Sequence, residues 1–294
     1  MDELEKYDLL TDAREQERET AEDALELLFD ALDTSLFALA ARLIAGLDTD
    51  AQGRIVFTVR NISKIGRAAV TLQAETAKAN RSILSKIYNR FLRLFGLGTK
   101  YQAIFTDPRA VEKDIAAKVF DLYGFQDGKQ TPDGYIADIL RSNPAARQIV
   151  DQMRKAVAGR VPLAKFQKDF AEFFTNANGG LSKRHFARFS HDLYMEFDRT
   201  LSLEYATELG TDTHAIYAGV RVRDSREFCM DRLNQIYTRA VIDSWNNLDW
   251  QGKRPGDVKV VLGGYNCTHN LNWISADFSE LWARERGVEI NSYR

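Results

Sequence analysis

The residues best suited to chemistry in this sequence are two cysteines and one histidine near its C-terminal end. Cys229 ends the run Asp224-Ser-Arg-Glu-Phe-Cys, and a second run, Gly263-Gly-Tyr-Asn-Cys-Thr-His, contains Cys267 and His269. Thiolate, imidazole and carboxylate groups are ligands that zinc accepts in proteins. We therefore treat Cys229, Cys267 and His269, with Asp224 as a fourth ligand, as a candidate zinc site.

The spacing of these residues leaves two other interpretations of the cysteines open. Tight zinc knuckles usually contain two Cys-x-x-Cys or His-x-His pairs, whereas this sequence contains one Cys-x-His pair. The thiols could instead form a buried pair that oxidises once the protein leaves the cell, or be unrelated core residues. Two cysteines in 294 residues are too few for a fold built on disulfides, so we expect synthesis in a reducing cytoplasm.

Catalysis by the same residues has little support in the sequence. A cysteine nucleophile needs a histidine base in contact with it, which Cys229 and His269 could provide. His185 and His191 lie six residues apart on an expected helix, so they do not share a face. The sequence has no GxSxG, Walker A or HExxH motif, and no GxGxxG between a strand and a helix. We expect no enzymatic activity, with an enzyme or toxin that uses Cys229 and His269 as the alternative.

Strands and helices are both expected around the candidate site. Residues 214–223 and 257–262 are rich in β-branched and aromatic residues with polar alternation, which predicts two strands. A long helix is expected before them, from about residue 182 to 209, between breaker residues. All four tryptophans fall in the last 70 or so residues. We therefore predict an α+β fold class, with a small C-terminal α+β domain at 181–294 that contains a short antiparallel sheet.

Residues 1–180 have the pattern of an α-helical body that begins with an acidic arm. Residues 2–33 contain 13 acidic and three basic residues. Apolar residues recur there at helical spacing, which predicts an amphipathic helix that runs to about residue 47. These apolar residues are Ala21, Ala24, Leu25, Leu28, Phe29, Leu32 and Leu36. Further helices are expected at 144–158 and at 165–175, where four phenylalanines are expected to pack in the core.

The segment after the acidic arm carries the opposite charge. Between residues 60 and 100 there are nine basic residues and one acidic residue, Glu75. An apolar stripe predicts a basic amphipathic helix here that ends at 96–98. Residues 54–60 fit either a short strand or the start of this helix, and we favour a helix that starts within 54–60. The stripe consists of Ile83, Ile87, Phe91, Leu94 and Phe95. We expect the acidic and basic segments to neutralise each other within or between chains, with packaged DNA as the alternative partner of the basic helix 60–100.

Composition and hydropathy restrict the class of protein further. The sequence is 45% hydrophobic and 28% charged, which is typical of a globular protein rather than a disordered one. The net charge of −2 predicts neither a dedicated nucleic-acid binder nor an acidic scaffold. The most apolar stretch, 36–47, contains Arg42 and is shorter than the roughly 20 residues of a spanning helix. We expect a soluble protein without a membrane segment or a secretory signal.

Several short runs together resemble the tailed-phage head-morphogenesis proteins related to the F protein of phage Mu. The similarity covers about residues 182–275, with the runs in the order and spacing of that family. The matching runs are Phe186-Ala-Arg-Phe-Ser-His-Asp-Leu-Tyr, Tyr205-Ala-x-Glu-Leu-Gly, Ala218-Gly, Asp224-Ser-Arg-Glu-Phe-Cys, Ile242-Asp-Ser-Trp and Gly263-Gly-Tyr-Asn-Cys-Thr-His.

The resemblance implies a minor head protein of the virion that acts in head morphogenesis near the portal vertex. Its partners would be portal or capsid proteins, and it would be present in several copies in each particle after synthesis in the host cytoplasm. A role in DNA packaging or ejection is also implied, with a DNA-binding internal virion protein as the alternative. No catalytic residue and no cofactor other than the candidate zinc is expected.

Overall fold

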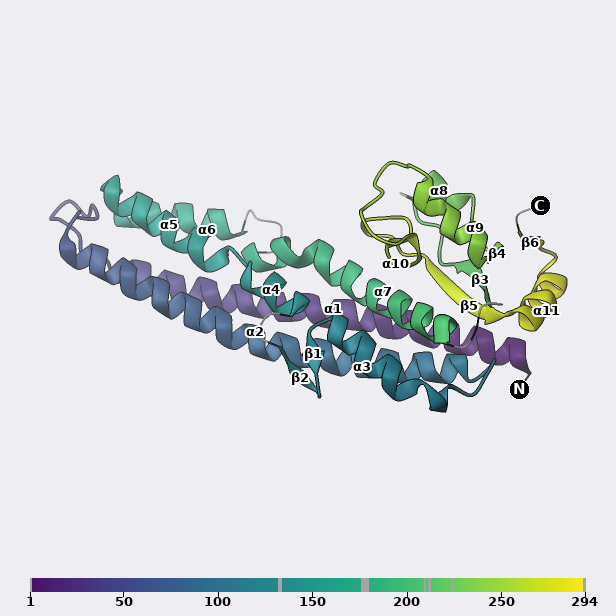
Figure 1. Cartoon of the computed structure of the whole chain (residues 1–294). Coiled ribbons are helices and arrows are strands. Elements are labelled where there is room, and N and C mark those ends of the chain that lie inside the picture. The colour runs from purple at the N-terminus through teal and green to yellow at the C-terminus, as the bar shows by residue number, and fades with distance from the viewer. Residues whose placement is uncertain are drawn as a thin grey trace. The chain divides into compact units, whose positions relative to one another are not determined.

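The computed structural model describes residues 2–131, 134–175, 180–208, 210, 213–223 and 225–292, and it is mainly helical with one small mixed sheet (Figure 1). The expected α+β fold class is confirmed. The helices are α1 (Glu3–Ala45), α2 (Val59–Gln102), η1 (Pro108–Ala110), α3 (Glu112–Leu122), α4 (Tyr135–Arg141), α5 (Ala145–Ala158), α6 (Leu163–Thr175), α7 (Leu181–Glu208), α8 (Glu227–Met230), α9 (Arg239–Ser244), η2 (Trp245–Asn247), α10 (Val258–Val261) and α11 (Ala276–Arg286). The strands are β1 (Phe125–Gln126), β2 (Lys129–Gln130), β3 (Thr213–Ala218), β4 (Ile236–Thr238), β5 (Asn270–Ser275) and β6 (Ile290–Asn291).

The chain forms two compact units, each of which contains parts of the three long helices. Unit 1 comprises residues 1–22, 88–134 and 188–294, and unit 2 comprises residues 23–87 and 135–187. These units are not the two successive segments, 1–180 and 181–294, that the sequence predicts. The difference arises because α1, α2 and α7 each contribute to both units.

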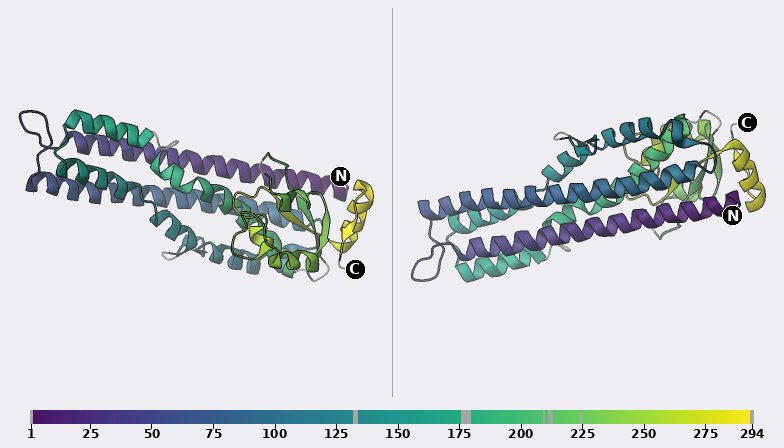
Figure 2. Two further views of the ribbon diagram at one scale, coloured as in Figure 1. Left: turned by 90° about the horizontal axis from the view of Figure 1, so that it is seen from above. Right: turned by 90° about the horizontal axis from the view of Figure 1, so that it is seen from below.

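Unit 2 is a helical assembly held together by aromatic side chains. Phe37 of α1 lies 6.0 Å from Phe170 and 5.2 Å from Phe174 of α6, measured between ring centroids. Figure 2 shows this part of α1 beside α6 in both of its views. Phe166, Phe170 and Phe174 are buried, which confirms their predicted core role, whereas Phe173 is only half-buried.

The N-terminus of α7 in unit 2 is capped by a carboxylate from α1. Asp33 accepts hydrogen bonds from the backbone N–H groups of Ser182, at 2.8 Å, and Lys183, at 2.9 Å. These N–H groups have no partner within the helix, and a negative charge is favourable at a helix N-terminus. The cap therefore fixes the start of the helix that later supplies residues to the candidate site.

The start of the basic helix lies within the predicted range 54–60, whereas its end differs from the predicted one. Residues 51–58 form a loop, with isolated bridges from Thr49 to Ile55 and from Arg54 to Pro162, and α2 begins only at Val59. At the other end, α2 continues past residues 96–98 to Gln102. A Cβ at Gly98 would lie 2.6 Å from Leu201 Cδ2, so α2 and α7 approach closely there. Helix packing outweighs the cost of about 1 kcal/mol for a glycine in a helix.

The sheet in unit 1 has the strand order β5-β3-β4-β6. The central strand β3 pairs antiparallel with both neighbours, so that Ala215 lies opposite Tyr237 on one side and Trp273 on the other. Strands β4 and β6 are parallel. The sheet is therefore mixed, which corrects the prediction of an antiparallel sheet.

The predicted strand at 257–262 is wrong. This segment is the short helix α10, whose N-cap Asp257 accepts a hydrogen bond from the Lys259 backbone N–H at 3.0 Å. Val258 and Val261 are buried three residues apart, as helical neighbours on one face. A run this short carries too few residues to distinguish strand from helix periodicity. The predicted strand at 214–223 does form, although β3 ends at Ala218.

The sheet is buried on both faces, and β3 shows the alternation directly. Tyr217 points into a core that also contains Trp245, Trp273 and both cysteines. Ile216 points into the opposite core, which α11 and the first residues of α1 cover through Phe278 and Tyr7. Side chains alternate between the faces of a strand, so each face of this short sheet gains its own apolar core.

One buried carboxylate joins three elements of unit 1. Asp198 of α7 accepts hydrogen bonds from Arg14 of α1, at 2.7 and 3.0 Å, from Arg18 of α1, and from Asn270 of β5, at 3.0 Å. Asp198 is fully buried and Arg14 is 1% exposed. Burial alone would raise the pKa of Asp198, but the charges of Arg14 and Arg18 hold it below its usual value.

The acidic arm forms further ion pairs within unit 1, of which the pair of Glu17 with Arg90 joins it to the basic helix as predicted. In unit 1, Arg90 of the basic helix lies 2.9 Å from Glu17, and Arg286 lies 2.9 Å from Asp8. His191 of α7 lies 2.9 Å from Glu22.

Within the described part of the chain, no helix is long and apolar enough to span a membrane.

We predict that Asp198→Ala destabilises the protein by about 3 to 5 kcal/mol, because it leaves the charges of Arg14 and Arg18 buried without a counter-ion. Urea unfolding followed by circular dichroism measures this change. The matched control is Asp138→Ala, which breaks an exposed pair with Arg141 and should change stability by no more than about 0.5 kcal/mol. Equal effects of the two substitutions would contradict the assigned role of Asp198.

His191 gives a prediction with a defined pH dependence. Burial alone would lower its pKa, but the hydrogen bond and charge of Glu22, with Asp192 in the same sense and Arg199 opposing, raise it overall. A raised pKa means that the charged form stabilises the fold fully below about pH 6.5 and that this contribution is lost as pH rises through the raised pKa. The stability difference between the wild type and His191→Gln, measured by urea unfolding, should therefore shrink as pH increases from about 6 to 8. A difference that stays constant over this range would contradict the pairing.

Candidate functional site

The structure brings together three of the four predicted metal ligands. Cys229 lies on α8, and Cys267 and His269 lie in the loop between α10 and β5. Their ligand atoms all lie within 4.8 Å of one another, and Cys267 Sγ is 3.7 Å from His269 Nδ1. The three residues are at most 2% exposed. Asp224 lies outside the described residues, so its role as a ligand stays a prediction.

The loop that carries Cys267 and His269 is held by a buried arginine. Arg199 of α7, which is 2% exposed, donates hydrogen bonds to the backbone carbonyls of Cys267, at 2.6 Å, His269, at 3.1 Å, and Val260, at 3.1 Å. A planar guanidinium can donate to several carbonyls at once, which a lysine cannot do in the same geometry. Arg199 thus fixes both loop ligands relative to α7.

Sequence reasoning missed Arg199 and its neighbour Asp198. Two charged residues lie side by side on a helix whose flanking positions, Phe197 and Leu201, are both buried. Charged side chains are seldom fully buried unless they are paired, so a charged pair within an apolar helical stripe is the signal that could have identified them. Arg14 and Arg18 were counted only as charges of the acidic arm, although they continue its buried stripe.

A second arginine and two glycines shape the same loop. Arg226 donates to the carbonyls of Gln251, at 3.1 Å, and Tyr265, at 2.7 Å, so it ties the segment before Cys229 to the loop of Cys267. A Cβ at Gly263 would collide with the sulfurs of both cysteines, and one at Gly264 would collide with a backbone carbonyl. The Gly-Gly pair therefore allows the close approach of the two cysteine runs.

The two thiols differ in their electrostatics. The hydrogen bond with Cys267, together with burial, raises the pKa of the Cys229 thiol. The same hydrogen bond lowers the pKa of the Cys267 thiol against the effect of burial, with Arg199 and His269 acting in the same direction. Tyr217 lies beside both sulfurs, and burial raises the pKa of its hydroxyl well above the usual value.

This arrangement suits binding of an ion better than attack on a substrate. A nucleophile must reach its substrate, whereas both cysteines are almost completely enclosed by protein atoms. Two thiols and an imidazole within a few ångströms are soft ligands of the type that zinc accepts.

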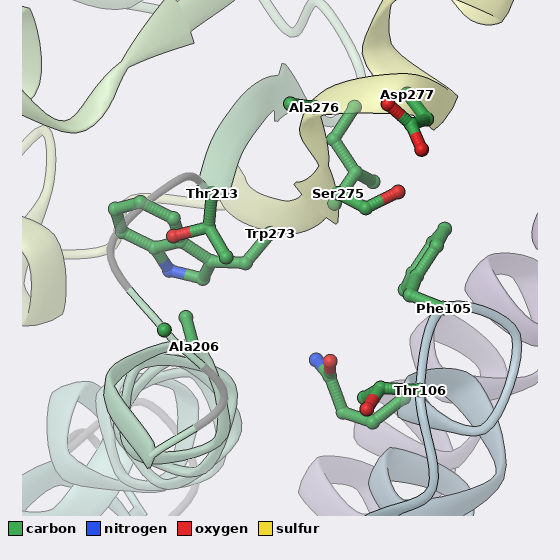
Figure 3. Close-up of a pocket in the computed structure, with 11 residues that line it drawn as sticks. Phe105, Thr106, Ala206, Thr213, Trp273, Ser275, Ala276 and Asp277 are labelled. Atoms are coloured by element: carbon green, nitrogen blue, oxygen red, sulfur yellow. The ribbon is translucent and has the colours of Figure 1, made fainter.

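A separate cavity of about 530 Å³ lies in unit 1 between the end of α2, the end of α7 and the start of α11 (Figure 3). Figure 3 shows Trp273 and Thr213 on one side of it and Phe105 on the other. The indole N–H of Trp273 and the amide nitrogen of Gln102 are buried without a hydrogen-bond partner among the described residues. Among the described residues that line the cavity, Asp277 is the single titratable one.

We predict that Gly263→Ala destabilises the protein by about 1 to 3 kcal/mol, because the added methyl group would displace two sulfurs. The matched control is Gly66→Ala on α2, where nothing lies within 4 Å of the added Cβ. This control should stabilise the protein by about 0.5 to 1 kcal/mol, since alanine is the better helix former. Thermal unfolding of both variants measures the contrast, and a neutral Gly263→Ala would contradict the tight approach of the cysteine runs.

Comparison with known proteins identifies no relative of this chain: no model of a protein family, no curated protein and no solved structure matches it.

Proposed function

We propose that this chain is a minor phage head protein, a structural component of the virion that acts in head morphogenesis near the portal vertex. The observation that carries the proposal is the convergence of the runs that resemble the Mu F-related proteins. Cys229, Cys267 and His269, which end two of these runs, lie within 4.8 Å of one another in a single buried site.

Residues of three of the four other runs of the resemblance pack around the same site. Ala218-Gly219 ends β3, and a Cβ at Gly219 would lie 2.9 Å from the Cα atom of His269. Ile242, Trp245 and Ala206 belong to the apolar core that contains both cysteines. Short runs that matched a family by chance would have no reason to meet in one core. Their convergence supports the interpretation that they belong to one folded module.

The enclosed site also supports a structural rather than an enzymatic role. The two thiols are buried, and the cavity beside Trp273 has a single titratable residue among the described residues that line it. Within the described part of the chain, neither place combines an accessible nucleophile with a base in contact with it. The alternative of an enzyme or toxin that uses Cys229 and His269 therefore gains no support from the geometry.

Exposed charges on α2 support contacts with portal proteins, capsid proteins or packaged DNA. Arg67, Lys78, Arg81 and Lys86 in unit 2 are exposed and have no ion-pair partner among the described residues. Partly neutralised basic faces of this kind attract phosphate groups or acidic protein surfaces. We therefore retain packaged DNA in the proposal as a partner of the basic helix 60–100. The proposed role as a head protein also implies localisation in the virion.

The test is quantitative mass spectrometry of purified, DNA-filled particles of the source phage, with its portal and major capsid proteins as internal standards. We expect this chain in the particles at a copy number close to that of the portal protein. A copy number far above the portal value would contradict placement at the vertex and favour an internal DNA-binding protein. Absence from both mature particles and proheads would overturn the proposal.

A further inference from the structure

We propose that Cys229, Cys267 and His269 bind one zinc ion, which fixes the loop of Cys267 to α8. The inference does not depend on the proposed phage function, because it rests on the three ligands and their surroundings alone. The site would be a structural one, since its ligands are buried and come from two runs that are far apart in the sequence.

The distances between the ligand atoms fit a zinc ion. Zinc–sulfur and zinc–nitrogen bonds in a tetrahedral site place neighbouring ligand atoms about 3.5 to 3.8 Å apart. Cys267 Sγ and His269 Nδ1 are 3.7 Å apart, and all three ligand atoms lie within 4.8 Å. Small shifts of side chains would therefore bring the three ligand atoms to zinc-binding distances, with the fourth position left for a further ligand.

Binding of zinc would also balance the negative charge of two thiolates in the buried site. Each thiol loses its proton to solvent, and two thiolates with a neutral imidazole then hold one doubly charged cation, so that the buried group is neutral. Arg199 alone cannot balance the charge of two thiolates, because its guanidinium already donates to three backbone carbonyls.

The residues around the ligands resemble those that orient ligands in metal sites. Arg199 fixes the backbone of Cys267 and His269, and Gly263 leaves space for both sulfurs. The Tyr217 hydroxyl is buried beside the Cys229 thiol. It is placed to donate a hydrogen bond to a zinc-bound thiolate or to a water in the fourth position.

A disulfide explains fewer of these features. Oxidation would remove two electrons and two protons from the thiols, and it would leave no role for the buried His269 beside Cys267. A metal uses all three residues. It also explains how a loop with left-handed backbone at Leu262 and Asn266 keeps one conformation beside a helix of only four residues.

The first test is the zinc content of the full chain, purified without chelator and measured by elemental and native mass spectrometry. We expect about one zinc per chain in the wild type and at least a tenfold loss in Cys267→Ser and His269→Ala. The matched control is His185→Ala, which removes an exposed histidine from α7 and should keep its zinc. Full zinc in Cys267→Ser would overturn the proposal.

A second test uses the wild-type chain, so that it does not depend on the folding of a variant. A strong zinc chelator should lower the melting temperature and make two thiols reactive toward a thiol reagent, and added zinc should reverse both effects. Cobalt in place of zinc should give the absorption bands of cobalt–thiolate bonds, which zinc then abolishes. An intact mass two hydrogens lower without bound metal would show a disulfide and reject the metal site. A reduced chain that takes up neither zinc nor cobalt would reject it as well.

Discussion

The arrangement of unit 1 depends on the charge of one buried carboxylate. Asp198 is the counter-ion of Arg14 and Arg18, and all three are buried among apolar side chains. Buried charges are costly unless they are paired and hydrogen bonded, so this geometry tolerates little displacement of any partner. The first part of the acidic arm, up to residue 22, is therefore a fixed part of unit 1, because its two arginines have their counter-ion on α7.

Arg199, the residue after Asp198 on α7, is a second buried charge, and it holds the candidate metal site in place. Arg199 donates to the carbonyls of the loop that carries Cys267 and His269, whereas Asp198 accepts from α1 and from Asn270 of β5. Successive residues on a helix point in directions about 100° apart, so one turn of α7 can serve two different neighbours. Because Asn270 follows His269 directly, the carboxylate and the guanidinium hold two ends of one short segment.

The sequence predicted those features that depend on periodicity and residue type. The apolar stripe of α1, the phenylalanine core of α6 and the meeting of the two cysteine runs are all present in the structure. Features set by contacts between distant residues were missed or wrong. Gly98 continues α2 because Leu201, which is distant in the sequence, packs against it. Local patterns cannot reveal such tertiary contacts.

The partner of a buried charge is the least visible feature in a single sequence. Arg14 and Asp198 are 184 residues apart, and each belongs to a charged helix where one more charge attracts no notice. Arg14 and Asp198 can be recognised by their positions, because each lies among buried apolar residues of its helix. A stripe position occupied by Arg or Asp predicts a buried partner, since the alternative is an unpaired charge in the core. Applied to α7, this rule places Asp198 in the core and links the N-terminal helix to the site through a single helical turn.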